Sequence, residues 1–209
     1  MVAVSLRRQR RAGLGYIAVG SVIAVGVWFA VLGALPPLTG LEDLGARMAF
    51  TLKCFGVAVL FTLVLGVEAV AHERLMSPAF NPLDGFETPR LRVNQRFLQN
   101  TLEQTVVFAA ALFGLAAYSP TGGAMRAVVA TSVVWTLGRI LFWLGYHRSA
   151  AGRAIGEPGS MVLSMIVLVY VACRFGAELA GPIGGYATLA LFLAAEASLF
   201  WFTRPLTAR

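Results

Sequence analysis

The chain has 209 residues, of which 58% are hydrophobic and 13% are charged, and its mean hydropathy is +0.75. This composition excludes a soluble globular domain, and the long apolar runs predict an all-α, polytopic membrane helix bundle. The net charge of +7 does not indicate nucleic-acid binding. The basic residues gather at the ends of apolar segments, where they set membrane topology.

Six apolar segments follow one another along the chain and predict six membrane-spanning helices. A proline pair at positions 36 and 37 ends the first segment, and links containing proline or glycine separate several of the others. The length suits one membrane domain over residues 1–209. In chain order, the predicted helices cover residues 14–36, 48–71, 91–118, 124–148, 159–176 and 184–203.

The distribution of arginine predicts the topology. Arginines are concentrated before the first helix, in and just after the link over residues 72–91, and in the link over residues 148–153. Cytoplasmic loops carry an excess of lysine and arginine. The sequence therefore predicts that these links, and both termini, lie on the cytoplasmic side of the bilayer.

A polar stripe marks the start of the third predicted helix. Arg92, Arg96, Asn100 and Glu103 are spaced at i, i+4, i+8 and i+11, which places them within roughly 80° of one another around a helix. Burying such groups against lipid is costly, so the stripe is expected to face protein, water or a ligand. The alternative is an interfacial role, in which the charged residues snorkel or pair with their neighbours.

A second stripe lies on the fourth predicted helix and requires that this helix continue past Gly152. Its members are spaced at i, i+3, i+7 and i+14: Arg139, Phe142, Tyr146 and Arg153. An arginine in the middle of a membrane helix needs a partner. We expect Glu103 to be that partner in an interhelical ion pair.

The chain shows no pattern of metal ligands. His72 and His147 are far apart in sequence and are not accompanied by further ligands. Both cysteines, Cys54 and Cys173, lie inside apolar segments and are predicted to be packing residues. The sequence therefore predicts neither a metal site nor a disulfide.

Two motifs resemble the MAPEG family of membrane-associated proteins in eicosanoid and glutathione metabolism, which includes microsomal glutathione transferases and leukotriene-C synthase. The first is Arg96-x-x-x-Asn100-x-x-Glu103 followed by an apolar run. The second is Gly-Tyr-x-Arg-Ser-Ala-x-x-Arg over residues 145–153. The resemblance covers about residues 50–176, so the core is assigned to residues 48–176. The helices over residues 14–36 and 184–203 are additions to the four-helix family pattern.

The resemblance implies four-helix subunits that assemble as trimers, with glutathione bound between subunits. It assigns glutathione binding to five residues: Arg96, Asn100, Glu103, Arg139 and Tyr146. Arg153 is the predicted catalytic residue. The chemistry is consistent, because arginine forks suit the carboxylates of glutathione and a glutamate suits its ammonium. A cation near a thiol also lowers its pKa from about 8.5 and favours the reactive thiolate.

The leading functional hypothesis is a membrane-bound thiol transferase or peroxidase that acts on apolar electrophiles. The second is a non-catalytic membrane subunit or binding partner, because Leu98, Gln104 and Phe142 replace polar groups that family members carry in the pocket. A small transporter with Glu68 and Glu196 as intramembrane sites ranks last. The chain shows no paired repeats or broken helices of the kind that such transporters have.

Overall fold

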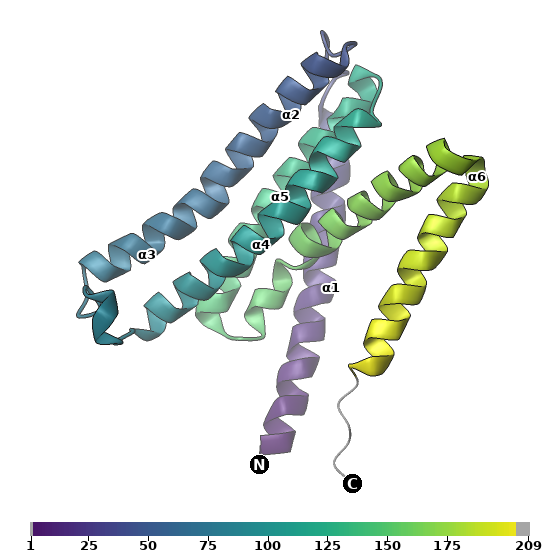
Figure 1. Ribbon diagram of the computed structural model, residues 1–209. Coiled ribbons are helices and arrows are strands. Elements are labelled where there is room, and N and C mark those ends of the chain that lie inside the picture. Colours follow the sequence, from purple (N-terminus) through teal and green to yellow (C-terminus); the bar gives the residue numbers. More distant parts are fainter. Residues whose placement is uncertain (1, 204–209) are drawn as a thin grey trace.

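The computed structural model describes residues 2–203, with side chains from residue 7 onward. The regular elements of this part of the chain are helices, arranged as long rods side by side (Figure 1). The predicted all-α bundle is confirmed. The carboxy-terminal arginines Arg204 and Arg209 lie outside the described residues.

The first helix, α1 (Val2–Ala34), is the amino-terminal addition and begins well before the predicted residue 14. Arginine is a good helix former, so the basic segment continues the helix without a break. Several contacts attach α1 to the core, and two regions of α1 illustrate them. The Arg126 guanidinium donates to the carbonyl oxygens of Leu32 and Leu35 at 3.1 and 3.0 Å, and Gly20 lies against the backbone of Ile155.

The second predicted helix is one continuous rod in the structure. It comprises α2 (Leu44–Val59), a π-helical turn η1 (Leu60–Val64) and α3 (Leu65–Leu75). Asp43 caps its start by accepting a hydrogen bond from the Ala46 amide at 3.1 Å. A loop with a short 3₁₀ turn, η2 (Pro82–Asp84), then leads back to the bundle.

Helices α4 (Pro89–Ala117) and α5 (Gly122–Arg148) form the centre of the molecule and match their predicted ranges closely. Threonine side chains cap both starts, since Thr88 accepts from the Leu91 amide and Thr121 accepts from the Ala124 amide. Between the helices, Phe108 and Trp135 stack with ring centroids 4.1 Å apart. These buried aromatic rings hold α4 and α5 in a fixed register.

The chain turns back immediately after α5, so the expected continuation of this helix past Gly152 is wrong. Gly145 and Gly152 approach so closely that neither has room for a side chain. A 3₁₀ turn η3 (Gly152–Ile155) and a π-helical turn η4 (Pro158–Val162) then lead into α6 (Leu163–Phe202).

Helix α6 consists of two arms that meet at a sharp reversal (Figure 1). Ala180 and Gly181 have non-helical backbone angles, with φ of +63° and ψ of −162° at Gly181. This backbone region is essentially restricted to glycine. The arms, residues 163–179 and 182–202, stand in place of the predicted helices 159–176 and 184–203. They pack closely where Gly176 meets Gly184.

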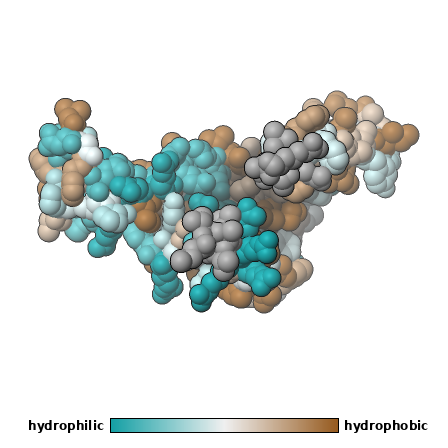
Figure 2. All heavy atoms as spheres, turned by 90° about the horizontal axis from the view of Figure 1, so that it is seen from below, coloured by the Kyte–Doolittle hydropathy of each residue, from teal (hydrophilic) through white to brown (hydrophobic). Residues whose placement is uncertain are grey.

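Five helical segments in the described residues are long and apolar enough to span a membrane, and the fifth contains the reversal in α6. The start of α1, the α3–α4 loop and the α5–η3 turn lie at one end of the bundle (Figure 1). Viewed from that end, hydrophilic residues cover much of the left and centre of the face (Figure 2). The segments are Arg7–Ala34, Leu44–Leu75, Pro89–Ala117, Gly122–Arg148 and Gly152–Phe202.

Candidate functional site

Four side chains that the sequence placed on one stripe form a column along α5. The Arg153 guanidinium lies 5.4 Å from the centroid of the Tyr146 ring. Tyr146 meets Phe142 edge to face at 5.7 Å, and the Phe142 ring centroid lies 4.4 Å from the Arg139 guanidinium carbon. The column therefore runs from an exposed arginine to a fully buried one. Helical spacing accounts for three of its members, whereas the turn at Gly152 brings Arg153 back over Tyr146.

The buried end of the column is a cation whose hydrogen-bond acceptors are neutral. Arg139 is 0% exposed. Its Nη2 donates to Thr101 Oγ1 at 2.8 Å, and its Nη1 donates to Gln104 Oε1 at 3.2 Å. The Phe97 ring lies 5.4 Å from the guanidinium carbon, so two aromatic faces and two neutral oxygens surround the charge.

The predicted ion pair between Arg139 and Glu103 is wrong within this subunit. Glu103 is exposed, and its Oε1 accepts a hydrogen bond from Gln99 Nε2 at 3.3 Å. One residue along a helix is a rotation of about 100°, so Gln104 faces α5 where Glu103 does not. In the sequence, Gln104 is a departure from the family pattern, and its place one residue from the expected partner is the signal that points to it.

The stripe on α4 is an open face of the subunit, as its spacing predicted. Arg92, Arg96 and Glu103 are exposed and Asn100 is half-buried. Arg92 forms an ion pair with Glu87 at 3.6 Å. Within the residues whose side chains are described, Arg96 has neither an ion pair nor a hydrogen bond, and its guanidinium is available to a ligand or a neighbouring subunit.

Gln104 connects the two stripes. Its Nε2 donates to Asn100 Oδ1 at 3.5 Å, while its Oε1 accepts from Arg139. A hydrogen-bonded chain thus leads from the buried Arg139 to Asn100 on the α4 face. The structure brings Arg139, Tyr146 and Arg153 into one column and joins Asn100 to it. Arg96 and Glu103 face outward from the same helix.

The η3 turn positions Arg153. The Gly152 amide donates to both the carbonyl oxygen and the hydroxyl of Ser149, at 3.1 and 2.9 Å, which fixes the turn just before the arginine. No carboxylate in the described part of the chain forms an ion pair with Arg153. The site therefore presents two uncompensated guanidinium groups, Arg96 and Arg153, which are suited to carboxylates and to a thiolate.

The fold is that of an integral membrane helix bundle, and the two stripes form its candidate cationic site. The model of the MAPEG family matches residues 51–177, which is more than half of the chain. The chain therefore belongs to the MAPEG family. The match ends before the second arm of α6 and begins after α1, so both are additions to the family core.

A curated relative supports the assignment. The uncharacterized protein sll1147 of Synechocystis sp. is similar to this chain, with 36% identity over 117 residues. The aligned part covers 54% of this chain and 78% of the relative. No solved structure matches. The family is thus established from sequence, and the relative's name assigns no activity.

Proposed function

We propose that this protein is a membrane-bound glutathione transferase or peroxidase that acts on apolar electrophiles as a homotrimer. One observation carries the proposal: the Arg153 guanidinium lies over the Tyr146 ring without a carboxylate partner among the described residues. Because Arg153 is exposed, its guanidinium is available to a substrate anion. Membership of the MAPEG family supports glutathione as the thiol and a trimer as the assembly.

The exposed α4 stripe supplies the recognition groups. Arg96 suits a carboxylate of glutathione, because a guanidinium binds carboxylates in a bidentate manner. Glu103 suits the ammonium group of the same molecule. Both side chains face outward from the subunit. We therefore place the thiol between this face and a neighbouring subunit.

Arg153 supplies the chemistry. Its positive charge stabilises a thiolate relative to a thiol, which lowers the thiol pKa from about 8.5. The thiol proton passes to water, and the thiolate sulfur attacks the electrophilic carbon. A sulfur–carbon bond forms while the leaving group departs with its electron pair. The apolar faces of the bundle admit lipid-soluble electrophiles directly from the membrane.

Arg139 has a different role in this proposal from the direct glutathione contact that the sequence suggested. Its guanidinium is fully buried and engaged by Thr101 and Gln104. It acts as a positioning residue, because it holds Phe142 beneath Tyr146 and Gln104 beside Asn100. Tyr146 of the column and Asn100 of the hydrogen-bonded chain are half-buried, so both lie closer than Arg139 to the exposed face.

The test combines binding with turnover. Calorimetric titration of the purified protein with glutathione should give saturable binding that Arg96→Gln abolishes. Arg153→Ala should lower kcat for a model electrophile by at least about tenfold, the effect of losing roughly 1.4 kcal/mol of transition-state stabilisation. Arg148→Ala is the matched control, since Arg148 is exposed on the same segment and has no assigned role. Unchanged kcat in Arg153→Ala would refute the catalytic assignment.

The second function is a non-catalytic membrane subunit, and two residues favour it. Gln104 and Phe142, which replace polar pocket residues of the family, both contact Arg139 and thereby stabilise the bundle. On this alternative, a folded trimer binds no glutathione, and Arg153→Ala changes neither folding nor assembly. The same titration therefore separates the two functions.

A further inference from the structure

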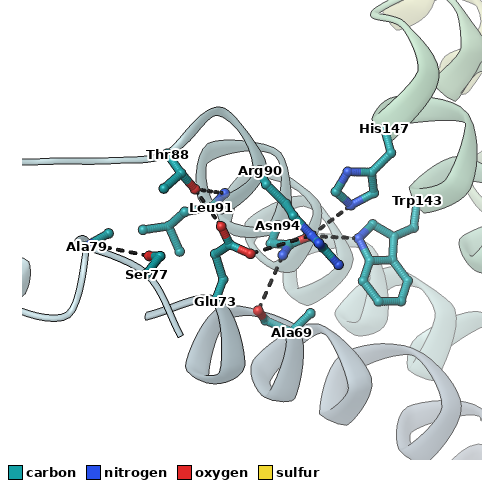
Figure 3. A network of polar contacts seen from close by, with 10 residues as sticks. All are labelled: Ala69, Glu73, Ser77, Ala79, Thr88, Arg90, Leu91, Asn94, Trp143 and His147. Carbon is teal, nitrogen blue, oxygen red and sulfur yellow. Dashed lines mark hydrogen bonds and ion pairs between the residues drawn. The ribbon is translucent and has the colours of Figure 1, made fainter. Parts of the chain in front are cut away.

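A polar pocket lies between α3, α4 and α5, and none of the residues assigned to the thiol lines it. Figure 3 shows the polar contacts around it. Its volume is about 320 Å³, within the range of about 300–1,000 Å³ that holds small ligands. Both histidines of the chain line it, although they are 75 positions apart in the sequence. The polar residues used below are Glu68, His72, Glu73, Arg90, Asn94 and His147.

Asn94 gives the pocket a fixed wall. It is 2% exposed, and its Nδ2 donates to the Ala69 carbonyl oxygen at 3.3 Å. Its Oδ1 accepts from Trp143 Nε1 at 3.0 Å and lies 2.9 Å from His147 Nε2 (Figure 3). With Nε2 as the donor in this contact, Nδ1 is the remaining polar atom of His147. One buried amide thus joins α3, α4 and α5 and preorganises the pocket.

Glu73 is already satisfied by residues of the chain. Its Oε1 accepts from the Thr88 hydroxyl at 2.7 Å, and its Oε2 lies 3.5 Å from Arg90 Nε (Figure 3). The pairing uses only the Nε edge of Arg90. The Nη groups of this guanidinium make no hydrogen bond to the described residues and remain available to an anion.

Glu68 and His72 line the pocket from α3 and have polar side-chain groups without a protein partner in the described part of the chain. They lie one turn apart on α3, and neither forms an ion pair or side-chain hydrogen bond among the residues whose side chains are described. The pocket therefore offers an open guanidinium edge with two imidazoles, and a separate open carboxylate. A ligand that carries an anionic and a cationic group on a short linker complements both.

We propose that this pocket binds the phosphoethanolamine headgroup of a membrane phospholipid. The phosphate lies against Arg90 and the histidines, because guanidinium groups bind phosphate in a bidentate manner. The primary ammonium donates hydrogen bonds to Glu68. A quaternary ammonium lacks such donors, and the Trp143 ring is stacked on Phe97 at 5.1 Å, which leaves that face unavailable to a quaternary cation.

The position of the pocket supports a lipid. It lies at the polar end of the membrane-spanning segments, the depth at which headgroups and interfacial tryptophans are found. The exposed apolar side chain of Leu65 on α3 lines the pocket and suits an acyl chain. This proposal does not depend on the thiol chemistry.

Native mass spectrometry of the full-length protein, titrated with defined phospholipids, tests the proposal. We expect phosphatidylethanolamine to bind at least about tenfold more tightly than phosphatidylglycerol, the effect of one charge-assisted hydrogen bond. Glu68→Gln should abolish this preference. Glu196→Gln, an exposed glutamate on α6, should keep it.

A second variant pair tests the phosphate contact. Arg90→Gln should weaken the binding of both phospholipids by a similar factor. Arg92→Gln should leave their binding unchanged, although Arg92 is also exposed and paired with a glutamate. Soluble phosphoethanolamine should compete with the lipid, and inorganic phosphate should compete far less. Equal binding of the two lipids by the unmodified protein, or equal competition by inorganic phosphate, would overturn the proposal.

Discussion

Arg139 shows how this chain accommodates a charge in the middle of a membrane bundle. An ionised group in a low-dielectric interior is costly unless its hydrogen-bonding groups are satisfied. Here Thr101 and Gln104 accept from the two Nη atoms, Nε has no partner among the described residues, and the rings of Phe97 and Phe142 face the guanidinium. No carboxylate forms an ion pair with Arg139 among the described residues, and the signature glutamate Glu103 lies on the outer face of α4, where Gln99 donates to it.

This arrangement predicts that Gln104→Leu destabilises the protein. The substitution leaves Arg139 Nη1 buried without an acceptor, which costs about 1–3 kcal/mol. We expect a lower thermal denaturation midpoint in detergent solution. Gln99→Leu is the control, because Gln99 is exposed on the same helix and surface substitutions change stability by about 0.5 kcal/mol or less. Equal midpoints for the two variants would show that Gln104 does not stabilise the buried charge.

At the residue scale, the sequence predicted the α4 stripe and the need for an Arg139 partner. It did not predict that partner, because the rotation of α4 relative to α5 is set by packing, including the stack of Phe108 on Trp135. The same limit applies to His72 and His147. Their separation in the sequence predicts no common site, and only the packing of α3 and α5 against α4 brings them to one pocket.

At the element scale, short turns rather than long helices place the residue assigned to thiol activation. Helix α5 ends at Arg148, and the contact between Gly145 and Gly152 turns the chain back on itself. The predicted juxtaposition of Tyr146 and Arg153 is therefore present, although the helical continuation that suggested it is absent. Periodicity cannot indicate such a turn, whereas the glycines at 145 and 152 are compatible with it.

The added helix α1 supports this turn, and Gly20→Leu tests that support. Gly20 is buried against the Ile155 backbone, so any side chain there displaces η3 and with it Arg153. If the proposed function holds, kcat should fall while glutathione binding at the α4 stripe is retained. Gly26→Leu is the control, since Gly26 is exposed and no atom lies within 4 Å of the place that a Cβ would occupy there. Equal kcat in the two variants would exclude a positioning role for α1.

The ends of the elements were predictable wherever a local signal marks them. Thr88 and Thr121 cap the central helices, and the Gly181-Pro182 pair marks the reversal in α6. The early start of α1 was not predicted, because charge was read as the end of the apolar helix although arginine continues a helix readily. Composition thus identified the membrane-crossing part of α1 and not the length of the helix.

At the scale of the whole molecule, the two ends of the bundle differ in charge. The positive-inside rule predicts that the end with the start of α1 and the α3–α4 loop faces the cytoplasm. Single cysteines in a background without Cys54 and Cys173 test this with a membrane-impermeant thiol reagent. Positions on the cytoplasmic end should be labelled only after the membrane is opened, and those on the other end in intact cells. The cytoplasmic positions are 11, 86 and 150, and the outer positions are 40 and 121.

Labelling of both sets in intact cells, or the reverse pattern, would contradict the predicted orientation.

The overall architecture itself followed from the sequence, since apolar length and two motifs predicted a helical membrane bundle with a MAPEG core and an addition at each end. The structure adds how those additions are attached. Helix α1 packs on α5 and the η3 turn, whereas the second arm of α6 folds back on the first.

The attachment of α1 has a consequence for how the protein is made. Arg126 donates to the carbonyl oxygens of Leu32 and Leu35. It follows Leu32 by 94 residues and Leu35 by 91 residues along the chain. At a synthesis rate of about 5–20 residues per second, α1 waits roughly 5 to 20 s for this partner. During that interval the first helix lies in the bilayer without the hydrogen bonds from Arg126. Assembly of the bundle is therefore completed only after the fourth segment has left the ribosome.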